Sequence, residues 1–173
     1  EREYLLRAAA DSSYQVRVEG GNLDAIIYVL LHEATHIVDV VTGITPHLED
    51  ADAVVEPTAF TKDIWRLMNK PTEPYIDSLL EHTRFRSGKP VSSSLAPNVY
   101  AKLSKTPFPS LYAMAAWSED AAELVTIYHM TTRLKQPFYV VVTKNNVEVS
   151  RFEPMKNRLV KRRLGKLAAF YEP

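Results

Sequence analysis

The chain has 173 residues, enough for one domain with a substantial core, and its 21 basic and 21 acidic residues give a formal net charge of zero. That balance gives no general attraction to nucleic acid or to an anionic membrane surface. The sequence has no cysteine, which excludes thiolate metal sites and disulfide scaffolds and leaves His, Asp and Glu as the strong metal ligands.

The N-terminal part of the chain predicts a short strand followed by a long helix. Residues 1–10 read as the end of a helix, and Tyr14–Val18 alternates like a strand. Asn22 can cap a helix that runs to about Thr42 and stops at Gly43. Because apolar residues recur along it at helical spacing, this helix is expected to be largely buried.

The middle of the chain, residues 44–110, is the least regular part. Short helices are expected at Thr58–Asn69 and Pro74–Phe85, and 87–109 is expected to be an ordered loop because apolar residues punctuate it. A second strong helix is predicted from about Ser118 to Leu134.

The C-terminal part predicts a β-hairpin and a last helix. Phe138–Thr143 and Val147–Phe152 flank the turn residues Asn145 and Asn146. Met155–Tyr171 reads as a basic amphipathic helix whose charges form a solvated face and not a nucleic-acid site. The whole chain is therefore expected to be α+β and mostly helical, one domain over 1–173 or the core of a longer chain.

The first helix carries an HExxH pattern, formed by His32, Glu33 and His36. The two histidines lie one turn apart on one face, so both imidazoles can bind one tetrahedral metal ion. The glutamate between them can take a proton from a water whose pKa zinc lowers toward about 7. Burying these polar residues in an apolar helix is costly without such a role, so the pattern predicts a Zn²⁺ site with Glu33 as general base.

The site requires a third protein ligand, and the sequence offers two sources. Glu56 follows His36 by twenty residues, a spacing that suits a thermolysin-type site, but Pro57 disfavours helical geometry there. Glu119 and Glu123 lie one turn apart on the second helix, where they would repel each other unless a cation lies near. One of them can bind zinc while the other accepts a hydrogen bond from a ligating histidine.

The set of Tyr112, Glu119 and Glu123 after HExxH resembles the pattern of the anthrax lethal factor–like and Pro-Pro endopeptidase–like zinc metallopeptidases. The resemblance implies a zincin-like catalytic domain. It makes Glu119 the third zinc ligand, Glu123 an outer support of the site, and the Tyr112 hydroxyl a donor to the developing oxyanion. It also implies a peptide or protein substrate. Those enzymes are secreted and the first residue is not Met, so an extracytoplasmic location is expected.

Several points stay open in the sequence. Asp39, one turn after His36, either orients a ligating histidine or caps a nearby backbone group. No apolar run reaches the roughly 18 residues of a membrane span, so none is expected. The favoured function is a zinc metallopeptidase. The alternatives are a non-catalytic binding module on the same scaffold, which the intact Glu33 disfavours, and a zinc hydrolase of a non-peptide amide.

Overall fold

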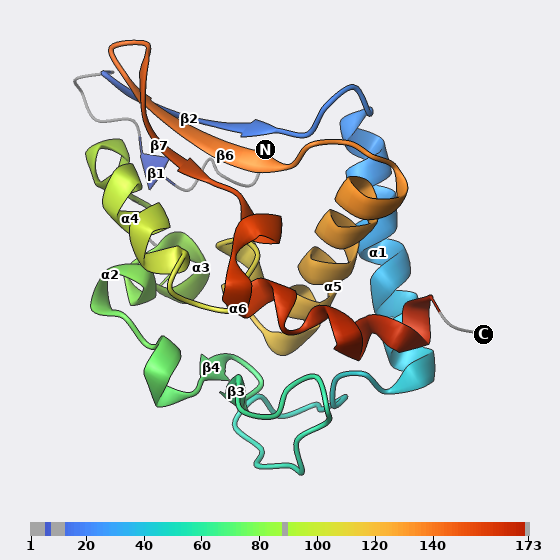
Figure 1. Ribbon diagram of the computed structural model, residues 1–173. Coiled ribbons are helices and arrows are strands. Elements are labelled where there is room, and N and C mark those ends of the chain that lie inside the picture. The colour runs from blue at the N-terminus through green and yellow to red at the C-terminus, as the bar shows by residue number, and fades with distance from the viewer. Residues whose placement is uncertain (1–5, 8–12, 88–89, 172–173) are drawn as a thin grey trace.

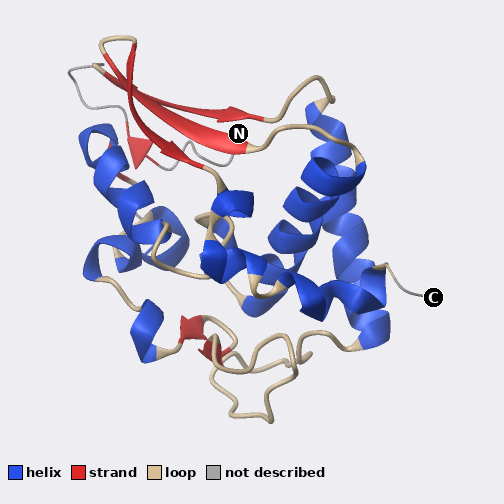
Figure 2. Cartoon of the chain, in the orientation of Figure 1, coloured by secondary structure: helices blue, strands red, loops and turns tan. Residues whose placement is uncertain are grey.

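A small antiparallel sheet lies along one edge of the protein, helices form the middle, and the loops and short strands of residues 43–72 lie at the opposite edge (Figures 1 and 2). The computed structural model describes residues 6–7, 13–87 and 90–171. Strands β2 (Tyr14–Glu19), β6 (Tyr139–Lys144) and β7 (Val147–Phe152) form the sheet in the order β2-β6-β7. The fold is α+β, as expected, although about half rather than most of the chain is helical.

The predicted hairpin is confirmed, and it recruits the predicted N-terminal strand. Asn145 and Asn146 both have positive φ angles, 49° and 64°, the conformation that a two-residue hairpin turn requires. Strand β2 then adds to the free edge of β6, with Val16 opposite Val142. Val140 and Val142 of β6 lie on one face of the sheet and pack in the hydrophobic core, so burial of this face fixes the strand register.

Helix α1 (Ala25–Thr42) ends as predicted but begins later and is much more exposed than expected. Its N-cap position is Asp24 rather than Asn22, and Gly43 ends it in the left-handed conformation with φ 64°. The expectation of a largely buried helix is wrong, because the face turned to the interior holds polar side chains while the apolar stripe lies outside. The large apolar residues exposed on this stripe are Ile26, Leu30, Ile37, Val40 and Val41.

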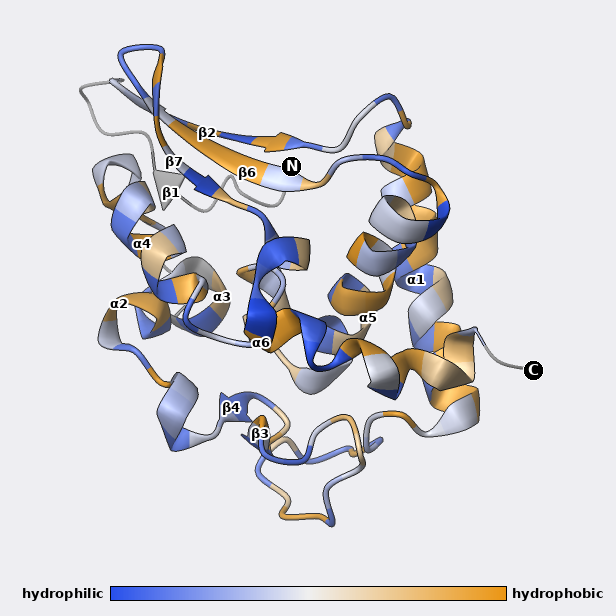
Figure 3. Ribbon diagram, in the orientation of Figure 1, coloured by the Kyte–Doolittle hydropathy of each residue, from blue (hydrophilic) through white to orange (hydrophobic). Residues whose placement is uncertain are grey.

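The length and composition of α1 also meet the minimum for a membrane span, a test that signal sequences and core helices of soluble proteins pass as well. Figure 3 shows hydrophobic residues on α1, α5 and β6 alike.

Helix α5 (Trp117–Tyr128) is the buried centre of the protein, and it continues as a π-helical turn, η4 (His129–Arg133). Together they confirm the helix predicted from Ser118 to Leu134. Nine of the twelve α5 residues are buried, and α5 packs along α1 (Figure 1). This packing brings the HExxH face of α1 against the first turn of α5.

The middle of the chain departs most from expectation. Thr58–Asn69 is not a helix, since turns lead there into the short strand β3 (Trp65–Leu67), which pairs with β4 (Lys70–Pro71). Within Pro74–Phe85 the helices are shorter than expected. The structure breaks this region into η1 (Glu73–Tyr75), α2 (Ser78–Glu81) and α3 (Arg84–Ser87).

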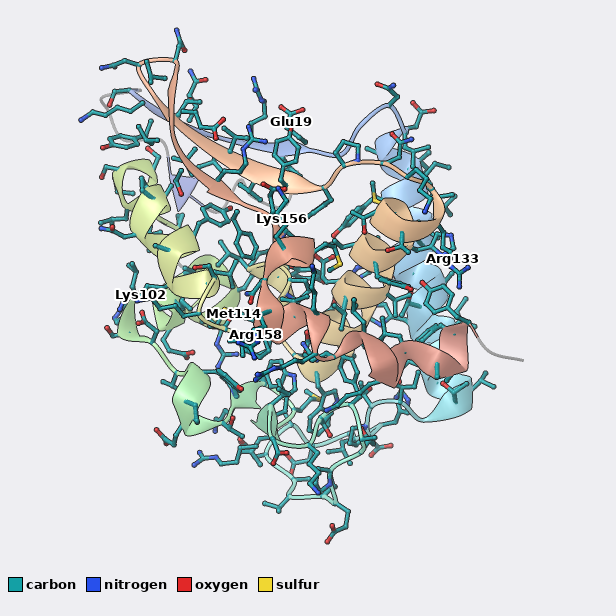
Figure 4. The ribbon with its side chains drawn as sticks, viewed as in Figure 1. Glu19, Lys102, Met114, Arg133, Lys156 and Arg158 are labelled. Atoms are coloured by element: carbon teal, nitrogen blue, oxygen red, sulfur yellow. The ribbon has the colours of Figure 1, made fainter. Side chains whose placement is uncertain are left out.

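The segment expected as a loop over 87–109 contains η2 (Ser93–Leu95) and a helix, α4 (Ala96–Leu103), which starts with Pro97 in its first turn. Lys102 of α4, labelled in Figure 4, forms an ion pair of 2.8 Å with Asp77 at the start of α2.

Both ends of the chain also differ from the predicted helices. Leu6–Arg7 forms the strand β1, parallel to β5 (Val91–Ser92), and the rest of 1–10 lies outside the described residues. The C-terminal helix is divided into η5 (Pro154–Lys156), α6 (Arg158–Lys161) and η6 (Leu164–Phe170).

The physical reason for the C-terminal division is a pair of side chains that point inward. Asn157 accepts from the N–H of Leu159 and donates to the carbonyl of Thr106, while Arg163 forms a buried ion pair with Asp120 of α5. Asn157 thus holds the segment to the loop that follows α4, and Arg163 holds it to α5.

Candidate metal centre

His32 and His36 lie one above the other on the inward face of α1. The ring of His32 is buried, whereas the side chain of His36 is 28% exposed. Their Nε2 atoms are 3.2 Å apart, and the rings meet edge to face with centroids 4.9 Å apart. The helix thus presents two imidazole nitrogens to one point, as the i, i+4 spacing predicts.

Glu119, in the first turn of α5, completes a group that could hold a metal ion. Its Oε2 atom is 3.0 Å from Nε2 of His32 and 3.6 Å from Nε2 of His36. A tetrahedral ion with bonds of about 2.0–2.1 Å holds its ligand atoms about 3.3 Å apart, which matches these three separations. Among the described residues, His32, His36 and Glu119 form the group with ligand atoms gathered in this way. Glu56 is exposed and lies outside the group.

The carboxylate of Glu119 is held in its ionised form. Burial raises its pKa, but hydrogen bonds from His32, His36 and Tyr112 outweigh the burial, and the pKa lies well below its ordinary value. An ionised carboxylate and two imidazoles are the donors of His₂Glu zinc sites. The side chain of Glu119 is 21% exposed, so this part of the group is open to solvent.

Glu123, one turn further along α5, supports His32 from behind. Its Oε1 atom is 3.0 Å from Nδ1 of His32 and accepts a 2.7 Å bond from the hydroxyl of Tyr28, and its Oε2 atom accepts a 2.6 Å bond from Ser110. Because a carboxylate only accepts, Nδ1 donates to Glu123, and Nε2 is the ring nitrogen turned toward Glu119 and His36. Such outer contacts orient metal-binding histidines.

Tyr112 lies over the same group from the turn η3 (Tyr112–Met114). Its ring stacks on that of His32, with centroids 5.6 Å apart and planes 28° apart, and it also packs against the ring of Phe85, with centroids 4.8 Å apart. Its hydroxyl hydrogen-bonds to Glu119. The phenol is therefore held at the edge of the group by two rings and a carboxylate.

Glu33 and Asp39 occupy different surroundings. Glu33 follows His32 on α1 and is exposed. Asp39 is buried and accepts hydrogen bonds from the backbone N–H of Thr45 at 2.7 Å and from its hydroxyl at 2.5 Å. The sequence left two roles open for Asp39, orienting a ligating histidine or capping a backbone group. Its bonds to Thr45 correspond to the capping role. His47, which has no ligand spacing in the sequence, donates from Nε2 to the backbone carbonyl oxygen of Asp39, 3.1 Å away, near the C-terminal end of α1.

Sequence reasoning missed two residues of the site, Tyr28 and Ser110. Tyr28 precedes His32 by one helical turn and so shares its face, a spacing that could have identified it. Ser110 lies in an irregular segment, and no pattern in the sequence connects it with Glu123.

Comparisons with known proteins find no match to this chain among family models, curated proteins or solved structures. The zincin-like fold and the family resemblance therefore stay predictions.

Proposed function

We propose that this protein is a zinc-dependent peptidase whose metal is held by His32, His36 and Glu119. The observation that carries the proposal is the spacing of the three ligand atoms at 3.0, 3.2 and 3.6 Å, contributed by two helices. The resemblance to the lethal factor–like and Pro-Pro endopeptidase–like peptidases supports it further. A peptide or protein substrate and an extracytoplasmic setting belong to the proposal and rest on that resemblance.

The residues around the group divide the chemistry between them. A bound zinc ion would supply a Lewis acid that lowers the pKa of a coordinated water and polarises a carbonyl. Glu33, exposed beside His32, accepts a proton from the attacking water and returns it to the leaving amine. Tyr112 donates its hydroxyl hydrogen to the oxyanion that forms on the carbonyl oxygen. Glu123 keeps the proton of His32 on Nδ1.

The first experiment digests a peptide library with the zinc-loaded protein and with Glu33→Gln, and records the zinc content of each. General-base catalysis is worth roughly 10²–10⁴-fold, so the variant is expected to retain one zinc and to cleave at least a hundredfold more slowly. Cleavage that survives in Glu33→Gln would refute the role of Glu33. A zinc-loaded wild type that cleaves nothing but still binds peptides would favour the binding module.

A matched pair of variants tests the third ligand. Glu119→Ala is expected to lose zinc, while Glu56→Ala, which removes an exposed carboxylate outside the group, is expected to keep it. Equilibrium dialysis with metal analysis measures both. Loss of zinc from Glu56→Ala alone would overturn the assignment.

A further inference from the structure

A cavity of about 250 Å³ adjoins the candidate metal centre, on the side of the N-terminal half of α1. The cavity is bounded by the end of β2, the start of α1, η4 and Phe138. Its apolar walls are formed by Val18, Leu23, Val29, Met130 and Phe138. Gly21, Asp24 and Ala25 line it and are exposed, whereas Met130 and Glu123 line it and are buried, so the cavity runs from the surface into the interior.

The cavity and the metal centre share one face of α1 and two side chains. Ala25 and Val29 line the cavity, and His32 and His36 follow them at intervals of three and four residues, which keeps all four on the same face. Val29 precedes His32 by about 4.5 Å along the helix axis, little more than one residue of an extended peptide. Tyr112 and Glu123 line the cavity as well as contacting His32.

The interior of the cavity suits an apolar group. The carboxylate of Glu123 already has three partners, His32, Tyr28 and Ser110, and the other acid on the lining, Asp24, is exposed at the mouth. Pockets for drug-sized ligands span roughly 300–1,000 Å³. A cavity of about 250 Å³ lies below that range and fits a single side chain.

We propose that this cavity binds one bulky apolar side chain of the substrate, next to the bond that is cleaved. The proposal rests on the proposed peptidase function and adds a substrate class, peptides with a leucine- to phenylalanine-sized residue at that position. Burial of the side chain provides binding energy and holds the adjoining peptide group over the metal centre.

Gly20 and Met130 set the depth of the pocket. A Cβ atom at Gly20 would meet only Cε of Met130, at 3.7 Å, an ordinary contact, so a side chain added there grows into the cavity without backbone strain. Gly21 does not allow such a change. Its φ is +75°, and an added Cβ would lie 2.2 Å from Oε1 of Gln136. That same oxygen accepts from the N–H of Asn22 and holds the mouth of the pocket.

The test measures binding to the metal-free protein and needs no turnover. The N-acetyl amides of leucine, phenylalanine, alanine and lysine are titrated while the backbone NMR resonances of Gly20 and Gly21 are followed. The leucine and phenylalanine amides are expected to bind at least tenfold more tightly than the alanine and lysine amides. Gly20→Leu is expected to weaken their binding at least tenfold, and Gly165→Leu, which fills open space at the exposed Gly165, is the matched control and should leave it unchanged.

A second variant keeps the proposal testable if Gly20→Leu does not fold. Met130→Ala enlarges the cavity and should shift the preference from leucine toward phenylalanine by at least fivefold. Tighter binding of the lysine amide, or equal effects of Gly20→Leu and Gly165→Leu, would overturn the proposal. If the protein cleaves peptides with no apolar preference, the pocket assignment fails and the peptidase stands. If apolar amides bind as expected and no peptide is cleaved, the pocket stands and the peptidase proposal fails.

Discussion

The support that Glu123 gives to His32 can be tested by replacing its charge without changing its shape. In Glu123→Gln the amide oxygen can still accept from Tyr28 and from Nδ1 of His32, while the amide nitrogen can donate to Ser110, whose hydroxyl also accepts. The fold should therefore survive. What is lost is the negative charge behind the imidazole that carries the ligating nitrogen.

The magnitude follows from two estimates that agree. A hydrogen bond to a charged group contributes about 1.5–3 kcal/mol and a neutral one about 1 kcal/mol, so the His32 bond weakens by about 0.5–2 kcal/mol. Since 1.4 kcal/mol corresponds to about tenfold, the zinc dissociation constant should rise roughly 2–30-fold. Outer-contact variants at other metal sites lose roughly 10–100-fold in affinity, which overlaps this range.

The assay is competition for zinc with a chromophoric chelator, run beside thermal unfolding of the metal-free protein. Glu56→Gln, a change at an exposed carboxylate, is the matched control and should leave the zinc dissociation constant unchanged. A folded Glu123→Gln protein that binds zinc within twofold of wild type would refute the reasoning, because the Glu123–His32 contact would then have no effect on the metal.

Three further predictions concern Tyr112, the buried ion pair of Asp120 and the effect of zinc on stability. Tyr112→Phe removes the hydroxyl bound to Glu119 and should lower kcat by about 10²-fold with little change in KM, measured on a peptide that the wild type cleaves. A rise in KM of the same size with kcat unchanged would instead assign Tyr112 to substrate binding. Asp120→Asn breaks the buried ion pair with Arg163 and should lower the free energy of unfolding, measured by urea titration, by about 3–5 kcal/mol. Asp52→Asn breaks the exposed ion pair with Lys70 and should have little effect on that free energy. Equal effects of the two variants would contradict the prediction. Zinc at a hundredfold excess over its dissociation constant should stabilise the fold by about 2.7 kcal/mol and raise the Tm measured by calorimetry by about 5–10 °C. A Tm that does not change when zinc is added would argue against a metal site in the folded state.

The sequence predicted correctly those elements that depend only on the conformational preferences and spacing of neighbouring residues. The spacing of His32 and His36 places both imidazoles on one helical face whatever surrounds the helix. Gly43 ends α1 because glycine reaches the left-handed conformation without steric cost, and the pair of asparagines turns the hairpin for a similar reason.

Local rules failed where tertiary contacts compete with propensity. The periodicity of α1 predicted a buried apolar face, yet the packing against α5 buries His32, Thr35 and Asp39 instead and leaves Val41 80% exposed. A hydrophobic pattern states that a helix has two faces, but the partners available to it decide which face is covered. Likewise, the inward contact of Arg163 with Asp120 divides a segment that is continuous in its sequence pattern.

The sequence by itself determined the chemistry that α1 offers, two imidazoles and a carboxylate within one and a half turns, and it named the acidic turn of α5 as a source of the third ligand. Only the tertiary structure decided that Glu119 meets the histidines, that Glu123 stands behind His32 with Tyr28 and Ser110, and that a cavity opens beside them. The physical reason is distance along the chain: His32 and Glu119 are separated by 87 positions, and no local preference fixes how two helices so far apart come to pack.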